Sequence, residues 1–241
     1  MTNITVIHAQ NLYEEKPTFV DDFDGNKLNK NIWIVEERQY KDRNVYFVDK
    51  RQKVRRGKLI LTLVKEHYKN CDFTGGSVYT KTQFGYGKLE VRAKVPANDE
   101  LWPAIWLKAT NWKLPLNGEI DILEHWRKTG KNQYQANFHL WGKIRNSGET
   151  HVQYPKVVHA DNISKWHIYT MINTPDSIVM EIDHKKVAKW TPNDVVDWPI
   201  NIPYDFRLSL NCSTWAMENV NKAKALPQKM LIDWVRFYKM K

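Results

Sequence analysis

Three carboxylates stand within six residues of one another in segment 118–124, whose sequence is Gly-Glu-Ile-Asp-Ile-Leu-Glu. At the two-residue period of a β-strand, Glu119 and Asp121 point to one face and the isoleucines point to the other. Glu124 lies an odd number of positions from Glu119, so a regular strand would bury it among the isoleucines, where an unpaired carboxylate is costly. A β-bulge between Asp121 and Glu124 removes this conflict. We therefore predict a bulged strand that carries all three acids on one face.

Two carboxyl groups that flank a glycosidic bond can hydrolyse it, because one attacks the sugar or activates water while the other protonates the leaving oxygen. A third acid beside the nucleophile can share its proton or orient it, and its charge helps to keep the other acid protonated. Glu119 and Glu124 would lie about 13 Å apart along an extended backbone. A concave sheet must bring them to the roughly 5 to 5.5 Å that a retaining mechanism prefers. A solvated edge strand or a calcium site is the alternative interpretation of the same acids.

The aromatic content also favours a sugar-binding surface, since eleven tryptophans and eleven tyrosines exceed the needs of a core, and aromatic faces stack on sugars or bases. Trp102 and Trp106 stand four apart, on the same face of an expected strand, so one can pack in the core and the other can carry a sugar. His139 and Trp141 share a face farther along the chain, although a lone histidine is more often structural than catalytic. Trp215 is a further aromatic candidate, in an expected loop.

The charge and the cysteines limit the classes of partner. A net charge of +10 and an isoelectric point near 9.4 suggest an anionic partner. The basic residues are spread along the chain, however, and the nearest cluster, residues 50–58, alternates with neutral residues and is typical of a solvated strand face. We expect no nucleic-acid partner. Cys71 and Cys212 form no disulfide framework and no metal-binding spacing, and whether they pair stays open.

No apolar stretch approaches transmembrane length, and the N-terminus lacks the regions of a signal peptide. The protein is therefore cytosolic, or a signal has been removed. We expect a secreted, periplasmic or cell-surface monomer.

Short apolar runs separated by Gly, Asn, Asp and Pro predict an all-β fold. Residues 87–96 alternate cleanly and end in a proline, as a half-buried strand does. The other runs that read as strands are 57–63, 75–80, 135–141, 166–172, 177–183, 206–211 and 231–238. Regular short strands without a linker predict one β-sandwich. We expect an N-terminal arm over residues 1–16 and a single catalytic domain over residues 17–241.

These motifs together resemble glycoside hydrolase family 16, over a match that runs from Phe19 to about Tyr238. Residues 119–124 fit the E-x-D-x-x-E signature of its bulged, laminarinase-like branch. Supporting segments are 86–96, 102–107, 174–178 and 232–238. The resemblance implies a jelly-roll β-sandwich of two curved antiparallel sheets, with a concave cleft for an internal stretch of polysaccharide.

The resemblance also assigns roles. It implies that Glu119 is the nucleophile, Asp121 its helper and Glu124 the acid/base of an endo-acting, retaining hydrolysis, with no cofactor needed for catalysis. It matches Trp102 and Trp106 to aromatic residues that line the glycone side of the cleft, and His139 to the strand that faces the catalytic one. Trp141, Asn211 and Trp215 are further candidates for substrate binding, although the segment before Trp215 lacks the glycine-rich loop that is common in the family. It further implies a structural calcium on the convex side, at positions that match Asp22, Gly57 and Asp233.

The Trp-Pro-Ala-Ile-Trp segment at 102–106 resembles laminarinase-type members, so we expect β-1,3-glucan or mixed-linkage β-1,3-1,4-glucan as the substrate. The basic composition keeps a second substrate class open: sulfated galactans such as agar, porphyran or carrageenan, or host mucin O-glycans. A non-catalytic carbohydrate-binding sandwich is the alternative of another class, and three intact acids speak against it. A nucleic-acid binder is the third class. Retention on heparin or DNA that disappears at moderate salt while polysaccharide activity persists would mark the positive charge as incidental.

Overall fold

A computed structural model describes residues 12–40, 43–98, 100–109, 116–125, 130–145, 148–199, 202–222 and 226–241. Seventeen β-strands dominate this part of the chain, and its one α-helix, α1 (Thr214–Glu218), has five residues. The first strands are β1 (Phe19–Asp21), β2 (Trp33–Val35), β3 (Val45–Phe47), β4 (Gln52–Val54), β5 (Leu59–Tyr68) and β6 (Cys71–Phe84). Then follow β7 (Gly87–Lys94), β8 (Leu101–Lys108), β9 (Leu116–Glu124), β10 (Gln133–Gly142), β11 (His151–Gln153) and β12 (Lys156–His159). The last are β13 (Trp166–Thr174), β14 (Ser177–Ile182), β15 (Lys185–Trp190), β16 (Tyr204–Cys212) and β17 (Gln228–Lys239).

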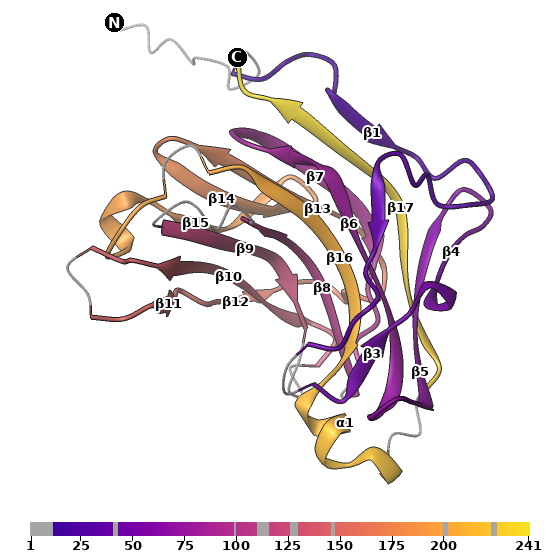
Figure 1. Cartoon of the computed structure of the whole chain (residues 1–241). Helices are drawn as coiled ribbons and strands as arrows, with labels where there is room; N and C mark the ends of the chain where they lie inside the picture. The colour runs from indigo at the N-terminus through magenta and orange to yellow at the C-terminus, as the bar shows by residue number, and fades with distance from the viewer. Residues whose placement is uncertain are drawn as a thin grey trace, which may run out of the picture.

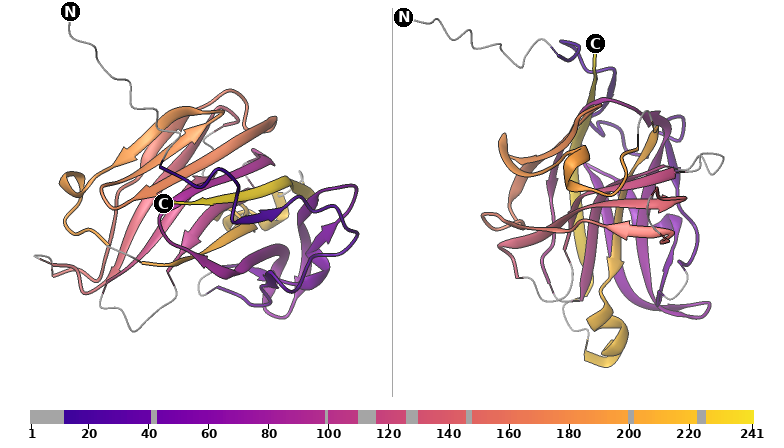
Figure 2. Two further views of the ribbon diagram at one scale, coloured as in Figure 1. Left: turned by 90° about the horizontal axis from the view of Figure 1, so that it is seen from above. Right: turned by 90° about the vertical axis from the view of Figure 1, so that its left-hand side faces the viewer.

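The strands form two layers. One sheet has the order β2-β6-β16-β8-β9-β10, and β11 and β12 both pair with β10. The other has the order β1-β17-β7-β13-β14-β15, with β5 also paired to β17 and β4 to β5. The long strands β5 and β6 pair with each other and so connect the layers. Strands such as β16 and β17 bend along their length (Figure 1), and α1 lies at one end of the sandwich (Figures 1 and 2).

All of these pairs are antiparallel. The short strand β3 also pairs with β6, and this pair is parallel. This arrangement confirms the predicted all-β jelly-roll sandwich, and each run that was expected to be a strand lies within one or overlaps it.

The core lies between the two sheets and follows from the alternation of the strands. In β7, Leu89, Val91 and Ala93 are fully buried, as the alternating pattern of residues 87–96 predicts. Burying a leucine or valine side chain such as these contributes about 1.5 to 3 kcal/mol. Ile120 and Ile122 point into the same core from β9, so the polar face of β9 is turned the other way, toward the concave surface.

The expected N-terminal arm is described only from residue 12 onward, and residues 1–11 lie outside the described part of the chain. Tyr13 forms an isolated antiparallel bridge with Met240, and the Glu14 amide donates to the Lys239 carbonyl at 2.9 Å. This short segment therefore lies along the end of β17. No helix within the described ranges is long and apolar enough to cross a membrane.

The two cysteines are both buried and both free thiols. Burial raises the pKa of the Cys212 thiol to about 12, and burial also raises the pKa of Cys71. The structure thus answers the open question of a disulfide: there is none between these residues.

Asp22 and Asp233, two of the three positions expected to hold calcium, form ion pairs within the protein. Asp233 is bonded to the Arg92 guanidinium and lies 3.4 Å from the Lys58 ammonium, while Asp22 lies 3.2 Å from the Arg236 guanidinium. A calcium ion takes six to eight oxygen ligands and is repelled by neighbouring cations. These acids therefore do not fit a calcium site, since the cations of the chain already neutralise them.

We accordingly expect that removing calcium does not destabilise the protein. Dialysis against EDTA should leave the melting temperature unchanged, and calcium added back should not raise it, as differential scanning calorimetry can measure. A melting temperature that falls by several degrees in EDTA and recovers with calcium, but not with magnesium, would contradict this expectation.

Candidate active site

The predicted bulge is present in β9, and the pairing register with each of its two neighbouring strands shifts there. Against β10, Asp121 pairs with Asn137 and Glu124 with Gln135, so three steps on β9 face two on its neighbour. Against β8, two steps on β9 face one step between Trp106 and Ile105. The extra residue lets two successive aliphatic side chains face the core and returns Glu124 to the face of the other two acids.

All three acids line one hollow on the concave sheet, with a volume of about 280 Å³. Its floor comes from alternate residues of β8, β9 and β16, and one wall comes from the segment before and within β3. The lining residues are Tyr40, Arg43, Phe47, Trp102, Ala104, Trp106, Lys108, Glu119, Asp121, Glu124, Trp141, Ser209 and Asn211. A single cleft therefore collects the acids, aromatic rings and cations.

Glu119 lies between a lysine and a histidine. Its Oε2 accepts a hydrogen bond from the Lys108 ammonium at 3.0 Å, and both side chains are largely buried. Its Oε1 lies 4.0 Å from His139 Nε2. Because β8 pairs Lys108 directly with Glu119, the cation is fixed beside this carboxylate by the register of the sheet.

Asp121 is the most deeply buried of the three acids, with 2% of its surface exposed. Burial raises the pKa of its carboxyl well above the usual range, and the charge of Glu119 raises it further, against a smaller opposing effect of Lys108. Its Oδ2 lies 2.9 Å from His139 Nε2. Asp121 is therefore the acid that keeps its proton while its neighbour is charged.

Glu124 is held by an indole at the other end of the bulge. Trp102 Nε1 donates a hydrogen bond to Glu124 Oε1 at 2.9 Å. Burial raises the pKa of Glu124 to about 8, and the Trp102 hydrogen bond opposes the rise. Glu124 is thus protonated at neutral pH and can give a proton to a leaving group.

Three rings of β10 and β11 lie nearly parallel beside the acids. Trp141 and His151 stack in parallel, with ring centroids 3.7 Å apart. His139 lies edge to edge with His151, with ring planes 7° apart and Nδ1 2.9 Å from His151 Nε2. Burial lowers the pKa of both histidines, so both are neutral at pH 7. The expected common face of His139 and Trp141 is confirmed.

The model of glycosyl hydrolases family 16 matches residues 39–236. The chain belongs to this family. It is a glycoside hydrolase, and its resemblance to the family, recognised from segment 119–124 and its supporting motifs, is confirmed.

Individual relatives of this family 16 chain act on different glycans. A β-glucanase of Rhodothermus marinus is 27% identical over 207 residues, covering 76% of this chain and 68% of that protein. A solved structure from work on endo-acting O-glycanases of human gut bacteria that initiate mucin breakdown is 29% identical. It has a TM-score of 0.80 and covers 93% of this chain and 91% of that one.

The laminarinase catalytic domain of Thermotoga maritima has a TM-score of 0.79 at 22% identity, covering 95% of this chain and 99% of that chain, and shows the shared fold. Other curated relatives are longer, and this chain spans 30% and 37% of the length of two of them.

The predicted binding residues have different positions in the family 16 cleft. Trp102 and Trp106 both face it, so neither packs in the core. One face of Trp102 is covered by the Arg43 guanidinium, 3.8 Å from the ring centroid, so that face is not open to a sugar. Asn211 also lines the cleft, whereas the Trp215 side chain lies outside the described part of the structure.

The polar site residues that were not foreseen include Tyr40, Arg43, Lys108 and His151. Lys108 had a signal in the sequence, because it follows Trp106 at the strand period and must share its face. Tyr40, Arg43 and His151 enter from segments distant in sequence, and no local pattern places them at the cleft.

Proposed function

We propose that this family 16 hydrolase cleaves internal β-linkages of a polysaccharide with retention, through Glu119 as nucleophile and Glu124 as acid/base. The bulge carries the proposal, because it turns Glu119, Asp121 and Glu124 toward one cleft. The acids also differ as the chemistry requires, since Glu119 is paired with the Lys108 ammonium while Glu124 keeps a proton.

In the first step a Glu119 oxygen attacks the anomeric carbon as the glycosidic C–O bond breaks, and Glu124 gives its proton to the departing oxygen. The product is an ester between the sugar and Glu119. Glu124, now charged, removes a proton from water as the water oxygen attacks the anomeric carbon, and the ester bond breaks. Asp121 in its uncharged form sits beside Glu119 without repelling its charge.

The pH dependence of the first step follows from Glu124. Its pKa near 8 predicts that kcat/KM falls above about pH 8, because the acid loses the proton that it must donate. Trp102→Phe removes the hydrogen bond that stabilises the charged form, so the basic limb should move to higher pH. Rates with a soluble oligosaccharide over pH 5 to 10 measure the basic limb in the wild type and in Trp102→Phe. A basic limb that stays at the same pH or moves to lower pH in Trp102→Phe would contradict this assignment.

We propose β-1,3-glucan or mixed-linkage β-1,3-1,4-glucan as the substrate. The support is the glucanase similarity reported above and the Trp-Pro-Ala-Ile-Trp segment of β8, whose tryptophans both face the cleft. A panel of laminarin, lichenan, agarose, porphyran, carrageenan, keratan sulfate and mucin glycans, assayed for new reducing ends, tests the choice. Product from laminarin or lichenan supports it, and product only from the galactans or mucin glycans overturns it.

A second substrate class is favoured by the cations of the cleft. Lys108 and Arg43 both line it, and the similarity to an O-glycanase structure covers most of both chains. We propose sulfated galactans or mucin O-glycans as this alternative, since ammonium and guanidinium groups bind sulfate or carboxylate substituents. Hydrolysis of these polymers that weakens with rising salt would support it.

The remaining proposals concern where and with what the enzyme acts. We propose that it works as a monomer outside the cytoplasm, where polysaccharides are met, and that it takes no nucleic acid as a partner. A purely carbohydrate-binding role would be supported if the panel gave binding to a glucan column but no hydrolysis by the folded protein.

A further inference from the structure

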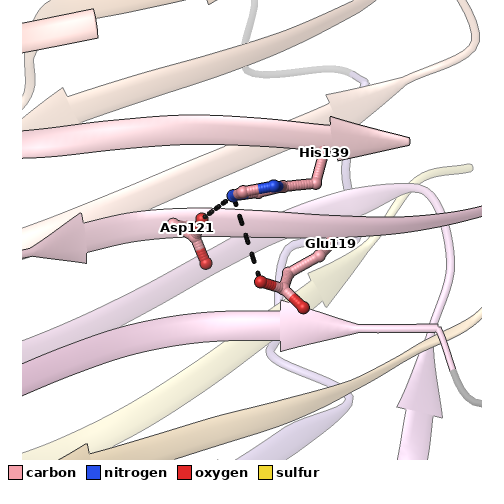
Figure 3. A group of neighbouring side chains, drawn as sticks. All are labelled: Glu119, Asp121 and His139. Atoms are coloured by element: carbon pink, nitrogen blue, oxygen red, sulfur yellow. Dashed lines mark ion pairs between the residues drawn. The ribbon is translucent and has the colours of Figure 1, made fainter. Parts of the chain in front are cut away.

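Three side chains of the cleft direct one donor atom each toward a common point. Glu119, Asp121 and His139 offer carboxylate oxygens and an imidazole nitrogen that all lie within 4.8 Å of one another (Figure 3). The His139 Nε2 atom is 2.9 Å from Asp121 Oδ2 and 4.0 Å from Glu119 Oε1. Zinc binds nitrogen at about 2.0 to 2.1 Å and carboxylate oxygen at about 2.0 to 2.2 Å, so an ion between these atoms needs only small side-chain movements.

One donor of the group has no hydrogen-bond partner inside the protein. Asp121 Oδ2 is buried and forms no hydrogen bond, although it lies close to His139 Nε2. The Asn137 amide explains why. Its oxygen accepts from the Phe138 and Tyr154 backbone amides, so its nitrogen is the atom that donates to His139 Nε2, at 2.8 Å.

The imidazole Nε2 is therefore an acceptor, and it faces Asp121 Oδ2 across 2.9 Å. Two such atoms repel each other unless a proton or a cation lies between them, and in the resting site the proton that Asp121 keeps meets this need. A metal ion that displaces the proton fits the same arrangement, because it accepts electron pairs from both atoms.

The surrounding residues orient the three donors as the outer shell of a metal site does. With Nε2 unprotonated, His139 carries its hydrogen on Nδ1 and donates it to His151 Nε2 at 2.9 Å. A metal-binding histidine almost always makes such a bond through its other nitrogen. Lys108 binds Glu119 Oε2 and leaves Oε1 turned toward His139. Asn137, displaced from Nε2 by the ion, keeps its contact with Gln153 Oε1 at 3.1 Å.

We propose that Glu119, Asp121 and His139 form a zinc-binding site at the floor of the cleft, and that zinc occupying it inhibits the enzyme. One imidazole and two carboxylates suit zinc, with a fourth, open position toward the cleft. Calcium and magnesium suit it poorly, because they prefer six or more oxygen ligands. Binding stands apart from the proposed function, whereas inhibition rests on it, because the ion takes the oxygen of the proposed nucleophile.

Isothermal titration of the purified chain with zinc chloride, at fixed neutral pH in a non-coordinating buffer, tests the site. We expect one zinc per chain and no comparable binding of calcium or magnesium. Asp121→Asn and His139→Ala should each weaken zinc binding at least tenfold, and His151→Ala by about 10- to 100-fold, the usual loss when an outer-shell partner is removed. Circular dichroism verifies that each variant is folded.

Two controls separate this site from surface binding and from the catalytic proposal. His67→Ala, which removes an exposed histidine beside Asp72, should leave zinc binding unchanged. Glu124→Gln should keep one zinc although it loses hydrolysis, since Glu124 is not among the donors. Zinc binding that persists at full strength in Asp121→Asn and His139→Ala, or is absent from the native chain, overturns the proposal. Zinc that binds as expected without inhibiting hydrolysis would instead count against Glu119 as nucleophile.

Discussion

Replacing Glu119 with alanine is expected to lower the rate of hydrolysis by at least about four orders of magnitude, the scale of loss when an enzyme nucleophile is removed. The proposed first step has no substitute for this oxygen, because Asp121 beside it is buried and keeps its proton. The loss is measured from initial rates of release of reducing ends, with the wild-type chain diluted until its rate falls in the range of the variant's.

Azide distinguishes loss of the nucleophile from loss of the fold. With an activated aryl β-glycoside, azide should enter the space left by Glu119→Ala and give a glycosyl azide of inverted configuration. Glu124→Ala still forms the ester with such a substrate, so azide should there give a product of retained configuration. If Glu119→Ala instead gave the product of retained configuration and Glu124→Ala the inverted one, the roles of Glu119 and Glu124 would be reversed.

Glu124→Gln should both reduce activity and stabilise the fold. Loss of a general acid typically costs 10²- to 10⁴-fold in rate, and glutamine cannot donate the proton although it can keep the hydrogen bond from Trp102. The same substitution removes a carboxyl whose buried position favours the neutral form. We therefore expect a folded but nearly inactive protein with a higher free energy of unfolding than the wild type.

The size and pH range of this stabilisation follow from the pKa. The folded-state pKa of Glu124 is about 8 against an ordinary value of 4.5, so the folded chain holds a proton that the unfolded chain has lost between these values. Stability falls as pH rises through this window, and at pH 7 the cost is about 3 kcal/mol. Urea unfolding at pH 4 and pH 7 should show the gain of Glu124→Gln at pH 7 and little gain at pH 4.

Glu66→Gln is the matched control for the sign of this effect. Hydrogen bonds from Lys50 and Thr74 lower the pKa of Glu66 to about 2, and Arg51 adds to the shift. That carboxylate stabilises the fold above pH 4.5, and the contribution is lost as pH falls toward 2. Glu66→Gln should therefore destabilise at pH 7, by a smaller amount because a third of the side chain is exposed. A gain in stability from both variants would refute the electrostatic explanation.

The position of the three acids could be derived from the sequence because β-strand geometry leaves few choices. An odd spacing between Glu119 and Glu124 required either a buried charge or a bulge, and the bulge is confirmed by the register of both neighbouring strands. The same period placed Trp102 and Trp106 on one face. These inferences depend only on alternation along one strand, which is local information.

Contacts between distant segments could not be derived in this way. Arg43 reaches Trp102 from a segment almost sixty residues earlier and covers a ring that was expected to carry a sugar. His151 joins the stack only because β11 folds back on β10. The calcium expectation came from position alone, and Lys58, Arg92 and Arg236 neutralise its acids in three dimensions. Such pairs depend on sheet order and loop paths, which no local pattern encodes.

The configuration of the first product tests the central claim most directly. A polysaccharide cleaved in the substrate panel should be hydrolysed in deuterated buffer, with proton NMR spectra recorded within minutes, before mutarotation mixes the anomers. Double displacement through Glu119 predicts that the newly formed reducing end appears first as the β-anomer and only later equilibrates with the α-anomer. An α-anomer that appears first would show a single displacement by water and would contradict the role of Glu119 as nucleophile.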